Sequence, residues 1–308
     1  MPSKPEYFDP RLTEQRNQRT TEIDVASSGE IVDLMHAEDR EVADAVYAER
    51  DRIAEAIDLA TRALEQEGRL VYVGAGTSGR LGVLDATECP PTFGIPPGMV
   101  VGLIAGGTAA LTRSQEGAED DVVAGSTAVE EHNVGPRDFV LGIAASGTTP
   151  YVRAAVVRAG ELGATTGLLT CADPPEDLVN RCDLIIAVRT GPEALTGSTR
   201  LKAGTATKLV LNTISTGAMI RLGKAFGNLM VDLMALSDKL VDRGERMVME
   251  ATGATREEAR QAIEQAGGSV RLAIVMVRKG VDASEGERLL AEAGGFVRKV
   301  VGEPPAVE

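Results

Sequence analysis

Two short segments of the chain combine glycine with hydroxyl side chains in a way that suits an anionic ligand. The first runs from Gly74 to Arg80 and the second from Ser146 to Pro150. Glycine lets backbone N–H groups approach a ligand closely, and hydroxyl groups donate hydrogen bonds to oxyanions. Each segment is expected to open a helix, whose N-terminal dipole favours negative charge. The hydroxyl residues that we predict to bind such a ligand are Thr77, Ser78, Ser146, Thr148 and Thr149.

The first segment superficially matches a dinucleotide-binding fingerprint, because Gly74, Gly76 and Gly79 have the spacing GxGxxG. That pattern alone is weakly specific. The acidic residue expected about 20 residues further on is missing, since the next apolar run ends in Gly106-Gly107. No Gly-Lys-Ser/Thr follows the segment, so a Walker loop is excluded as well. Two hydroxyl-rich segments suit a single phosphate better than a pyrophosphate. A tight strand-to-helix turn explains one such segment as well as a ligand does, but it explains the two together less well.

A third segment, from Gly191 to Thr205, places hydroxyl groups and two cations before a predicted helix. One interpretation is a helix N-terminus that Ser198 or Thr199 caps. The other is a further wall of the anion site, with Glu193 and Ser198 as ligand contacts. The residues alone leave both interpretations open.

Carboxylates for acid–base chemistry are harder to single out, because most of the 46 acidic residues must be solvated surface charges. Glu88 precedes Cys89 and two prolines, and Glu119 follows the second predicted strand. These glutamates are 31 residues apart (119 − 88), so only the fold could bring them together. Four other acidic residues compete equally on physical grounds: Asp85, Glu116, Asp120 and Glu193.

A parallel sheet is the element that would position these segments. After Gly68, short runs rich in β-branched residues alternate with longer helical stretches, which is typical of a doubly wound α/β fold. Ligands of such sheets lie beyond the carboxyl ends of the strands, where both glycine-rich segments fall. We expect an extended arm over residues 1–28, helices over 29–67 and 200–240, and three short helices after about residue 245. The five predicted strands are Arg69–Val73, Val100–Ala105, Phe139–Ala144, Thr166–Thr170 and Leu184–Val188.

Composition excludes several classes of function. The net charge of −14 argues against a nucleic-acid partner, which needs clustered Lys and Arg, but a local site could still hold an anion. Two histidines without Cys or carboxylate at ligand spacing exclude a His-rich metal site, and we expect neither metal nor cofactor. The most apolar run, Val100–Leu111, is 12 residues long and too short to cross a membrane. Three cysteines without CxxC spacing, and no visible signal peptide, predict free thiols in a cytoplasmic protein.

Several longer motifs, in a fixed order over roughly residues 12–300, carry a resemblance to a known family. The motifs are Leu12–Asn17, Gly74–Gly82 with Asp85–Gly94, Gly142–Gly147 with Thr149–Val152, Thr196–Ala206, Phe226–Asp232 and Ala273–Val277. Through these motifs the chain resembles N-acetylmuramic acid 6-phosphate etherases. The number and order of the motifs make the resemblance highly specific.

The resemblance implies a Rossmann-like sugar-isomerase (SIS) domain and a homodimer. It also implies an enzyme of cell-wall recycling that needs no metal. The family cleaves the C3 lactyl ether of the sugar phosphate, giving N-acetylglucosamine 6-phosphate and D-lactate. Its acid glutamate matches Glu88 and its second catalytic glutamate matches Glu119. We therefore expect an N-terminal arm and helices over 1–58, the SIS domain over 59–223 and a C-terminal helical region over 224–308.

Two positions depart from the family pattern. Thr148 stands where the family usually has Arg, and Gln18 stands where it has Pro. A guanidinium beside a phosphate or a carboxylate makes a bidentate contact that a hydroxyl group cannot make. Thr148 therefore bears on the affinity for the substrate and on its identity.

Elimination followed by hydration is the chemistry that this resemblance leads us to expect. Ring opening makes C1 an aldehyde and acidifies C2–H, so that Glu119 can remove the C2 proton while Glu88 protonates the lactyl oxygen. Two alternatives are a non-catalytic sugar-phosphate sensor similar to glucokinase regulatory proteins, and an SIS-type aldose–ketose isomerase. The sequence Glu-Cys-Pro-Pro-Thr at residues 88–92 favours the etherase over the sensor, and release of lactate separates it from the isomerase.

Overall fold

A computed structural model describes residues 11–232 and 238–306, so residues 1–10 of the predicted arm lie outside the described part. Five parallel strands form one sheet in the order β2-β1-β3-β4-β5, which confirms the predicted α/β class. Each strand agrees with its predicted run to within one residue at either end. The strands are β1 (Leu70–Gly74), β2 (Val100–Ile104), β3 (Phe139–Ile143), β4 (Thr165–Thr170) and β5 (Leu184–Ala187).

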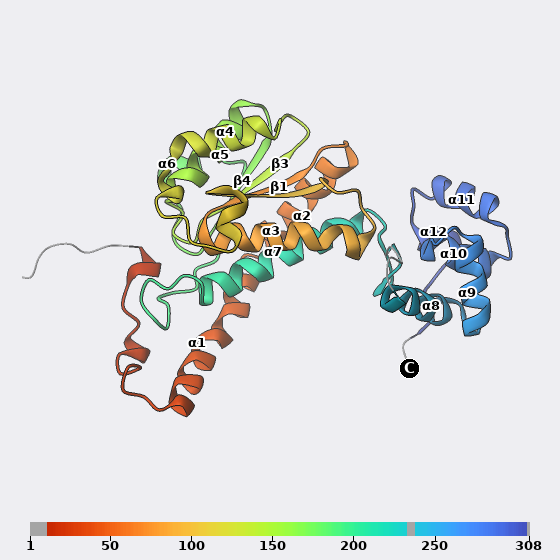
Figure 1. The fold of residues 1–308 in the computed structure, drawn as a ribbon, viewed down its shortest axis with the longest axis horizontal. Helices are drawn as coiled ribbons and strands as arrows, with labels where there is room; N and C mark the ends of the chain where they lie inside the picture. The colour runs from red at the N-terminus through yellow and green to blue at the C-terminus, as the bar shows by residue number, and fades with distance from the viewer. Residues whose placement is uncertain (1–10, 233–237, 307–308) are drawn as a thin grey trace, which may run out of the picture. The chain divides into compact units, whose positions relative to one another are not determined.

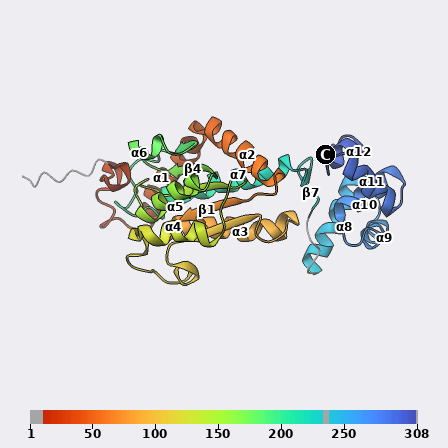
Figure 2. The ribbon, with the colours of Figure 1, turned by 90° about the horizontal axis from the view of Figure 1, so that it is seen from above.

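Helices cover both faces of this sheet (Figures 1 and 2). On one face, Val71 and Val73 of β1 pack in a buried cluster with Val152 of α5. On the other face, the hydroxyl of Tyr72 donates a hydrogen bond to Asp85 of α3, at 3.0 Å. This alternation explains why every residue of β1 is buried. The helices of this part are α1 (Ser28–Ala48), α2 (Arg50–Glu65), α3 (Gly76–Phe93), α4 (Val122–Glu131), α5 (Pro150–Glu161), α6 (Glu176–Val179) and α7 (Lys202–Arg221).

The register between β1 and β3 sets the position of the two glycine-rich segments. Gly74, the last residue of β1, is the partner of Ile143, the last residue of β3. Because the two strands are parallel neighbours, the chain leaves both at the same edge of the sheet. The segments that begin at Gly74 and Ser146 therefore start side by side, at the carboxyl edge where a ligand is expected.

The prediction of long helices over residues 200–240 is wrong for residues 222–232. The helix α7 ends at Arg221, and Gly223 follows with a φ of +77°, a left-handed conformation that glycine adopts easily. A short antiparallel hairpin comes next, formed by β6 (Ala225–Phe226) and β7 (Leu229–Met230). Its two-residue turn opens with Gly227 at a φ of +60°, as tight hairpin turns require. The helical spacing of apolar residues does not predict such a turn, because each glycine changes the backbone conformation only at its own position.

The chain divides into two compact units. The first contains residues 1–87 and 98–215, and therefore the whole parallel sheet. The second contains residues 88–97 and 216–308, with its own buried cluster around Ala273 and Ile274. Its C-terminal helices are α8 (Asp238–Thr252), α9 (Arg256–Gln265), α10 (Val270–Lys279), α11 (Ala283–Glu292) and α12 (Val297–Val301).

Candidate active site

A cavity of about 380 Å³ lies at the carboxyl edge of the sheet, within the first unit. The segment after β1 and the segment between β3 and α5 both line it. The structure therefore brings together the five hydroxyl residues that the sequence singled out. They are Thr77, Ser78, Ser146, Thr148 and Thr149.

Glycine is required where the first segment turns from β1 into α3. A Cβ on Gly74 would lie 2.6 Å from the backbone nitrogen of Gly79, and a Cβ on Gly79 would lie 2.7 Å from the carbonyl oxygen of Gly74. No real Cβ contact is that short, so any larger residue would push the helix away from the strand. The GxGxxG spacing here serves close packing of helix on strand, which leaves Thr77 and Ser78 in the first turn of α3.

Hydroxyl groups of the second segment are linked before α5 begins. The Oγ of Ser146 lies 2.9 Å from Oγ1 of Thr148, and the backbone N–H of Thr148 donates to the same Ser146 oxygen at 3.2 Å. Pro150 is the first residue of α5, so Thr149 occupies its N-cap position. Two helices, α3 and α5, thus direct their N-termini and hydroxyl groups toward one space, an arrangement that favours a phosphate.

The third segment forms part of the wall, but through other residues than predicted. Gly197 and Thr199 line the cavity, whereas Ser198 does not belong to its lining. Glu193 is completely buried and accepts hydrogen bonds from the backbone N–H groups of Lys202 (2.8 Å) and Ala203 (3.0 Å). Its carboxylate therefore occupies the N-terminus of α7. Burial raises the pKa of Glu193, and the two backbone hydrogen bonds oppose that shift.

Glu119 lies on the cavity. It belongs to a single helical turn, Ala118–Asp120, that follows β2 and precedes α4. Its exposed side chain lines both this cavity and an adjoining hollow of about 270 Å³, which also contains Arg80. A carboxylate in this position can reach a sugar that is bound through the neighbouring hydroxyl groups.

Glu88 is not among the residues that line this cavity. It lies in α3, on an exposed position between Thr87 and the buried Cys89. By its contacts it belongs to the second unit.

Two residues of the cavity wall, Arg11 and Glu14, come from the N-terminal arm. Nη1 of Arg11 lies 3.4 Å from Oγ1 of Thr148 and donates a hydrogen bond to it. Sequence reasoning missed both residues, because nothing in the local pattern of the arm marks a binding site. The only signal was the match of Leu12–Asn17 to a family motif, which includes Glu14 but not Arg11.

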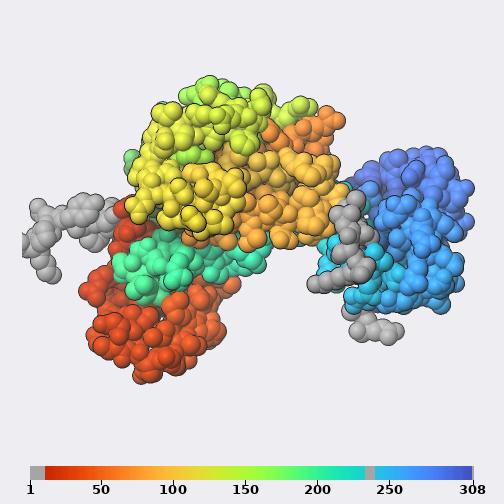
Figure 3. Space-filling view, viewed as in Figure 1, coloured from red at the N-terminus to blue at the C-terminus, as the bar shows by residue number. Residues whose placement is uncertain are grey.

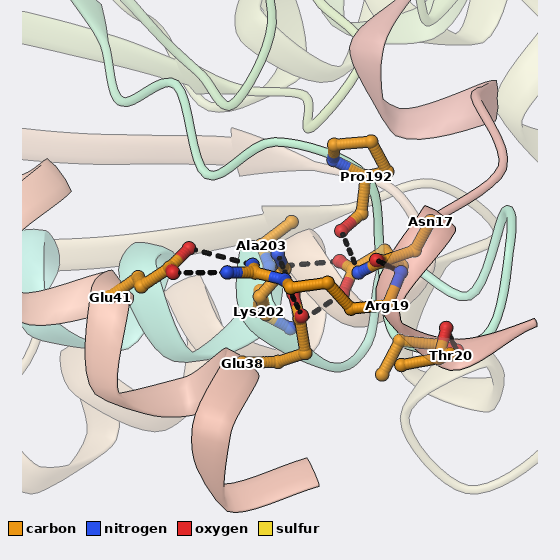
Figure 4. Close-up of polar contacts among 10 residues, drawn as sticks. Asn17, Arg19, Thr20, Glu38, Glu41, Pro192, Lys202 and Ala203 are labelled. Carbon is orange, nitrogen blue, oxygen red and sulfur yellow. Dashed lines mark hydrogen bonds and ion pairs between the residues drawn. The ribbon is translucent and has the colours of Figure 1, made fainter. Parts of the chain in front are cut away.

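A buried ion pair ties the arm, α1 and the third segment together (Figure 4). Nζ of Lys202 lies 2.6 Å from Oε2 of Glu38, and each side chain is only 1% exposed. Nε of Arg19 lies 2.6 Å from the other oxygen of Glu38, and Arg19 also pairs with Glu41. Burial opposes the charge on Glu38, but the hydrogen bonds from Lys202 and Arg19 outweigh it and lower the pKa of this carboxyl.

The arm is also attached directly to the third segment. The amide of Asn17 donates to the carbonyl of Pro192 at 3.3 Å, and the hydroxyl of Thr20 donates to the carbonyl of Ala194 at 2.8 Å. In the space-filling view, the N-terminal segments (red) lie directly against the chain around α7 (green) (Figure 3). The cavity wall at Thr199 is therefore held by contacts far from it in sequence.

Within residues 11–232 and 238–306, no group of three or more His, Cys, Asp and Glu side chains could hold a metal ion. Among the helices described, none is both long and apolar enough to cross a membrane.

Fold and cavity together define a class of protein, an α/β protein with a hydroxyl-lined cavity at the carboxyl edge of a parallel sheet. In agreement, residues 52–159 match the family model of the glucokinase regulatory protein N-terminal SIS domain. A solved structure of a phosphoheptose isomerase from Francisella tularensis matches with a TM-score of 0.46 and 19% identity, over 63% of this chain and 100% of that chain.

Similarity over the whole length identifies the family. An N-acetylmuramic acid 6-phosphate etherase of Mesorhizobium japonicum is 50% identical over 299 residues, which are 97% of this chain and 97% of that protein. The protein of the same name from Serratia proteamaculans is 50% identical over 93% of this chain and 96% of its own length. The chain belongs to the N-acetylmuramic acid 6-phosphate etherase family, which confirms the resemblance seen in the motifs.

Proposed function

We propose that the protein is a carbon–oxygen lyase that cleaves the C3 D-lactyl ether of N-acetylmuramic acid 6-phosphate. The products are N-acetylglucosamine 6-phosphate and D-lactate. One observation carries this proposal: in a chain of this family, the carboxylate of Glu119 shares a cavity with five hydroxyl residues at two helix N-termini. That cavity offers both a place for a phosphate and a base beside it.

The reaction proceeds by elimination and then hydration. The sugar ring opens, so that C1 becomes an aldehyde and C2–H becomes acidic. Glu119 takes the C2 proton, and the bond between C3 and the lactyl oxygen breaks. The match to the family motif assigns Glu88 as the acid that gives a proton to the departing oxygen, although Glu88 does not line the cavity of its own chain. Water then adds its oxygen to the C3 of the unsaturated aldehyde, and a proton returns to C2. Each acid–base step contributes a factor of about 10² to 10⁴ to the rate.

The phosphate binds to Ser78, Ser146 and Thr149, with Thr77 and Thr148 assisting. Gly197 and Thr199 form the third wall of the site. Ser198 lies between them in the chain, and we assign it a contact with the bound sugar although it does not line the cavity itself. Glu193 acts on this wall indirectly. The buried carboxylate of Glu193, bonded to the backbone at the start of α7, supports a role in shaping that wall.

The protein functions as a cytoplasmic homodimer that recycles cell-wall amino sugars. The two compact units divide the chain by packing. By role we divide it into an arm with helices (1–58), a sugar-phosphate-binding domain (59–223) and a helical region (224–308). Sedimentation at micromolar concentration should give a dimer, and a monomer there would contradict the assembly.

Isotope labelling tests the order of the chemistry. In D₂O the product sugar should carry deuterium at C2, and in H₂¹⁸O it should carry the label at C3. Displacement at the lactyl carbon would put the ¹⁸O into lactate instead, and that result would refute elimination. An isomerase would release no lactate at all, so the same assay separates the second candidate function.

Two variants test the roles of the glutamates. Glu119→Gln should lose both lactate release and exchange of the C2 proton, because no base remains. Glu88→Gln should block lactate release but retain C2 exchange, because Glu119 is still present. The matched control is Glu131→Gln, an exposed glutamate that does not line the cavity. Near-normal lactate release by Glu88→Gln would make Glu88 structural, and normal C2 exchange by Glu119→Gln would assign the base to another residue.

A further inference from the structure

The charges around the cavity are unbalanced for an anionic substrate. Three carboxylates line it, those of Glu14, Glu119 and Asp120. Among the described lining residues, Arg11 is the only Lys or Arg. A phosphate bound by neutral hydroxyl groups and backbone N–H groups would still feel the repulsion of these carboxylates. Within the lining of the cavity itself, Arg11 is therefore the residue whose charge can offset this repulsion.

The guanidinium of Arg11 is in contact with the hydroxyl residues themselves. Its Nη1 donates to Oγ1 of Thr148 at 3.4 Å, and that oxygen lies 2.9 Å from Oγ of Ser146. A phosphate oxygen that accepts from these hydroxyl groups would come within reach of the same guanidinium. A planar guanidinium can donate two parallel hydrogen bonds to a phosphate, which a hydroxyl group cannot do.

Hydrogen bonds and burial hold the backbone around Arg11 in place. Its carbonyl accepts a hydrogen bond from the N–H of Glu14 at 3.0 Å, which closes the single turn Leu12–Glu14. Thr13 in this turn is completely buried. Further along, Asn17 anchors the arm to the third segment. A half-buried Arg11 on this support is preorganised toward the cavity.

We propose that Arg11 is a phosphate-binding residue of the active site, which the N-terminal arm delivers to the loop at Ser146. The proposal rests on the function proposed above and adds a specificity-determining residue to it. The arm thereby becomes part of the site: a ligand that carries a phosphate is held by the loop before α5 and by the arm together.

Binding of N-acetylglucosamine 6-phosphate, measured by titration calorimetry, tests the assignment. Arg11→Ala should weaken this affinity by about 10- to 100-fold, the range for a lost hydrogen bond to a charged group. Affinity for unphosphorylated N-acetylglucosamine should not change. The matched control is Arg16→Ala, because Arg16 is an exposed residue of the same arm that does not line the cavity.

A rescue variant separates a lost contact from a damaged fold. The double variant Arg11→Ala/Thr148→Arg supplies a guanidinium from residue 148 in place of residue 11. Affinity for the phosphorylated sugar should therefore recover. Equal loss for phosphorylated and unphosphorylated ligands, or unchanged affinity in Arg11→Ala, would overturn the assignment. Lactate release by the unmodified protein is measured in parallel. If it is absent while the phosphate-dependent loss persists, the proposed function fails and the role of Arg11 stands.

Discussion

Replacing Glu38 by glutamine would remove one charge from a pair in which both side chains are 1% exposed. The shape of residue 38 stays the same, but Nζ of Lys202 keeps its charge and loses the carboxylate at 2.6 Å. Lys202 is the first residue of α7. The uncompensated charge therefore destabilises the point where the third wall of the cavity joins that helix. We predict a large loss of stability of the first unit.

Two estimates give the same magnitude. Removing one partner of a buried ion pair destabilises a protein by about 3–5 kcal/mol, because the other charge is left uncompensated. The variant could instead release the lysine proton, which costs roughly 4–5 kcal/mol at pH 7 for an ordinary lysine. Arg19 adds little to this loss, because its side chain is 53% exposed and water can solvate it.

Hydrogen exchange of the amides in β3 (Phe139–Ile143) measures this loss, because β3 lies in the core of the unit that holds the pair. The control is Glu41→Gln, which removes the other partner of Arg19. Glu41 is 55% exposed, so its variant should change the free energy of opening by less than about 1 kcal/mol. A loss below about 1 kcal/mol in Glu38→Gln as well would refute the reasoning.

The pH dependence has a definite sign. The pKa of Glu38 is lowered below its ordinary value of 4.5 in the folded protein. Its contribution is therefore fully present above pH 4.5 and is lost as the pH falls through the lower folded value. Glu38→Gln should lose less stability than the unmodified protein over that acid range, and parallel profiles would contradict the assignment.

The remaining predictions concern binding, packing, thiols and metals. Ser146→Ala should weaken binding of the sugar phosphate by about 1.5–3 kcal/mol in calorimetry, and unchanged affinity would exclude its loop from phosphate binding. Gly125→Ala should lower the free energy of unfolding by about 1–3 kcal/mol, because the new Cβ would lie 2.2 Å from the carbonyl oxygen of Tyr151. Gly135→Ala should be neutral, because its new Cβ would meet no atom within 4 Å other than those of the adjacent residues. Burial raises the pKa of Cys171 to about 12, so iodoacetamide at pH 8 should label it only after unfolding. Activity should survive EDTA, and loss that a divalent ion restores would overturn the two-glutamate mechanism.

The sequence by itself determined the sheet and the two hydroxyl-rich segments. A buried parallel strand has a short run of apolar residues in its sequence, usually bounded by glycines. Each run can be recognised from the residues of that strand alone. The segments after β1 and β3 follow from it, because parallel strands end at one edge of the sheet. Their hydroxyl residues were identifiable for the same reason: glycine spacing and hydroxyl type are local properties, which the tertiary structure only had to bring together.

Only the tertiary structure decided how the rest of the site is built. Glu38 and Lys202 are separated by 164 residues, and Arg11 and Thr148 by 137, so no spacing rule connects them. From the sequence, Glu193 was a candidate ligand contact. The fold instead places its carboxylate at the start of α7, where two backbone N–H groups need an acceptor. Such assignments depend on which charges and polar groups become buried together. Burial of that kind is a property of the packed chain, because each group meets its partner only after the segments between them have folded.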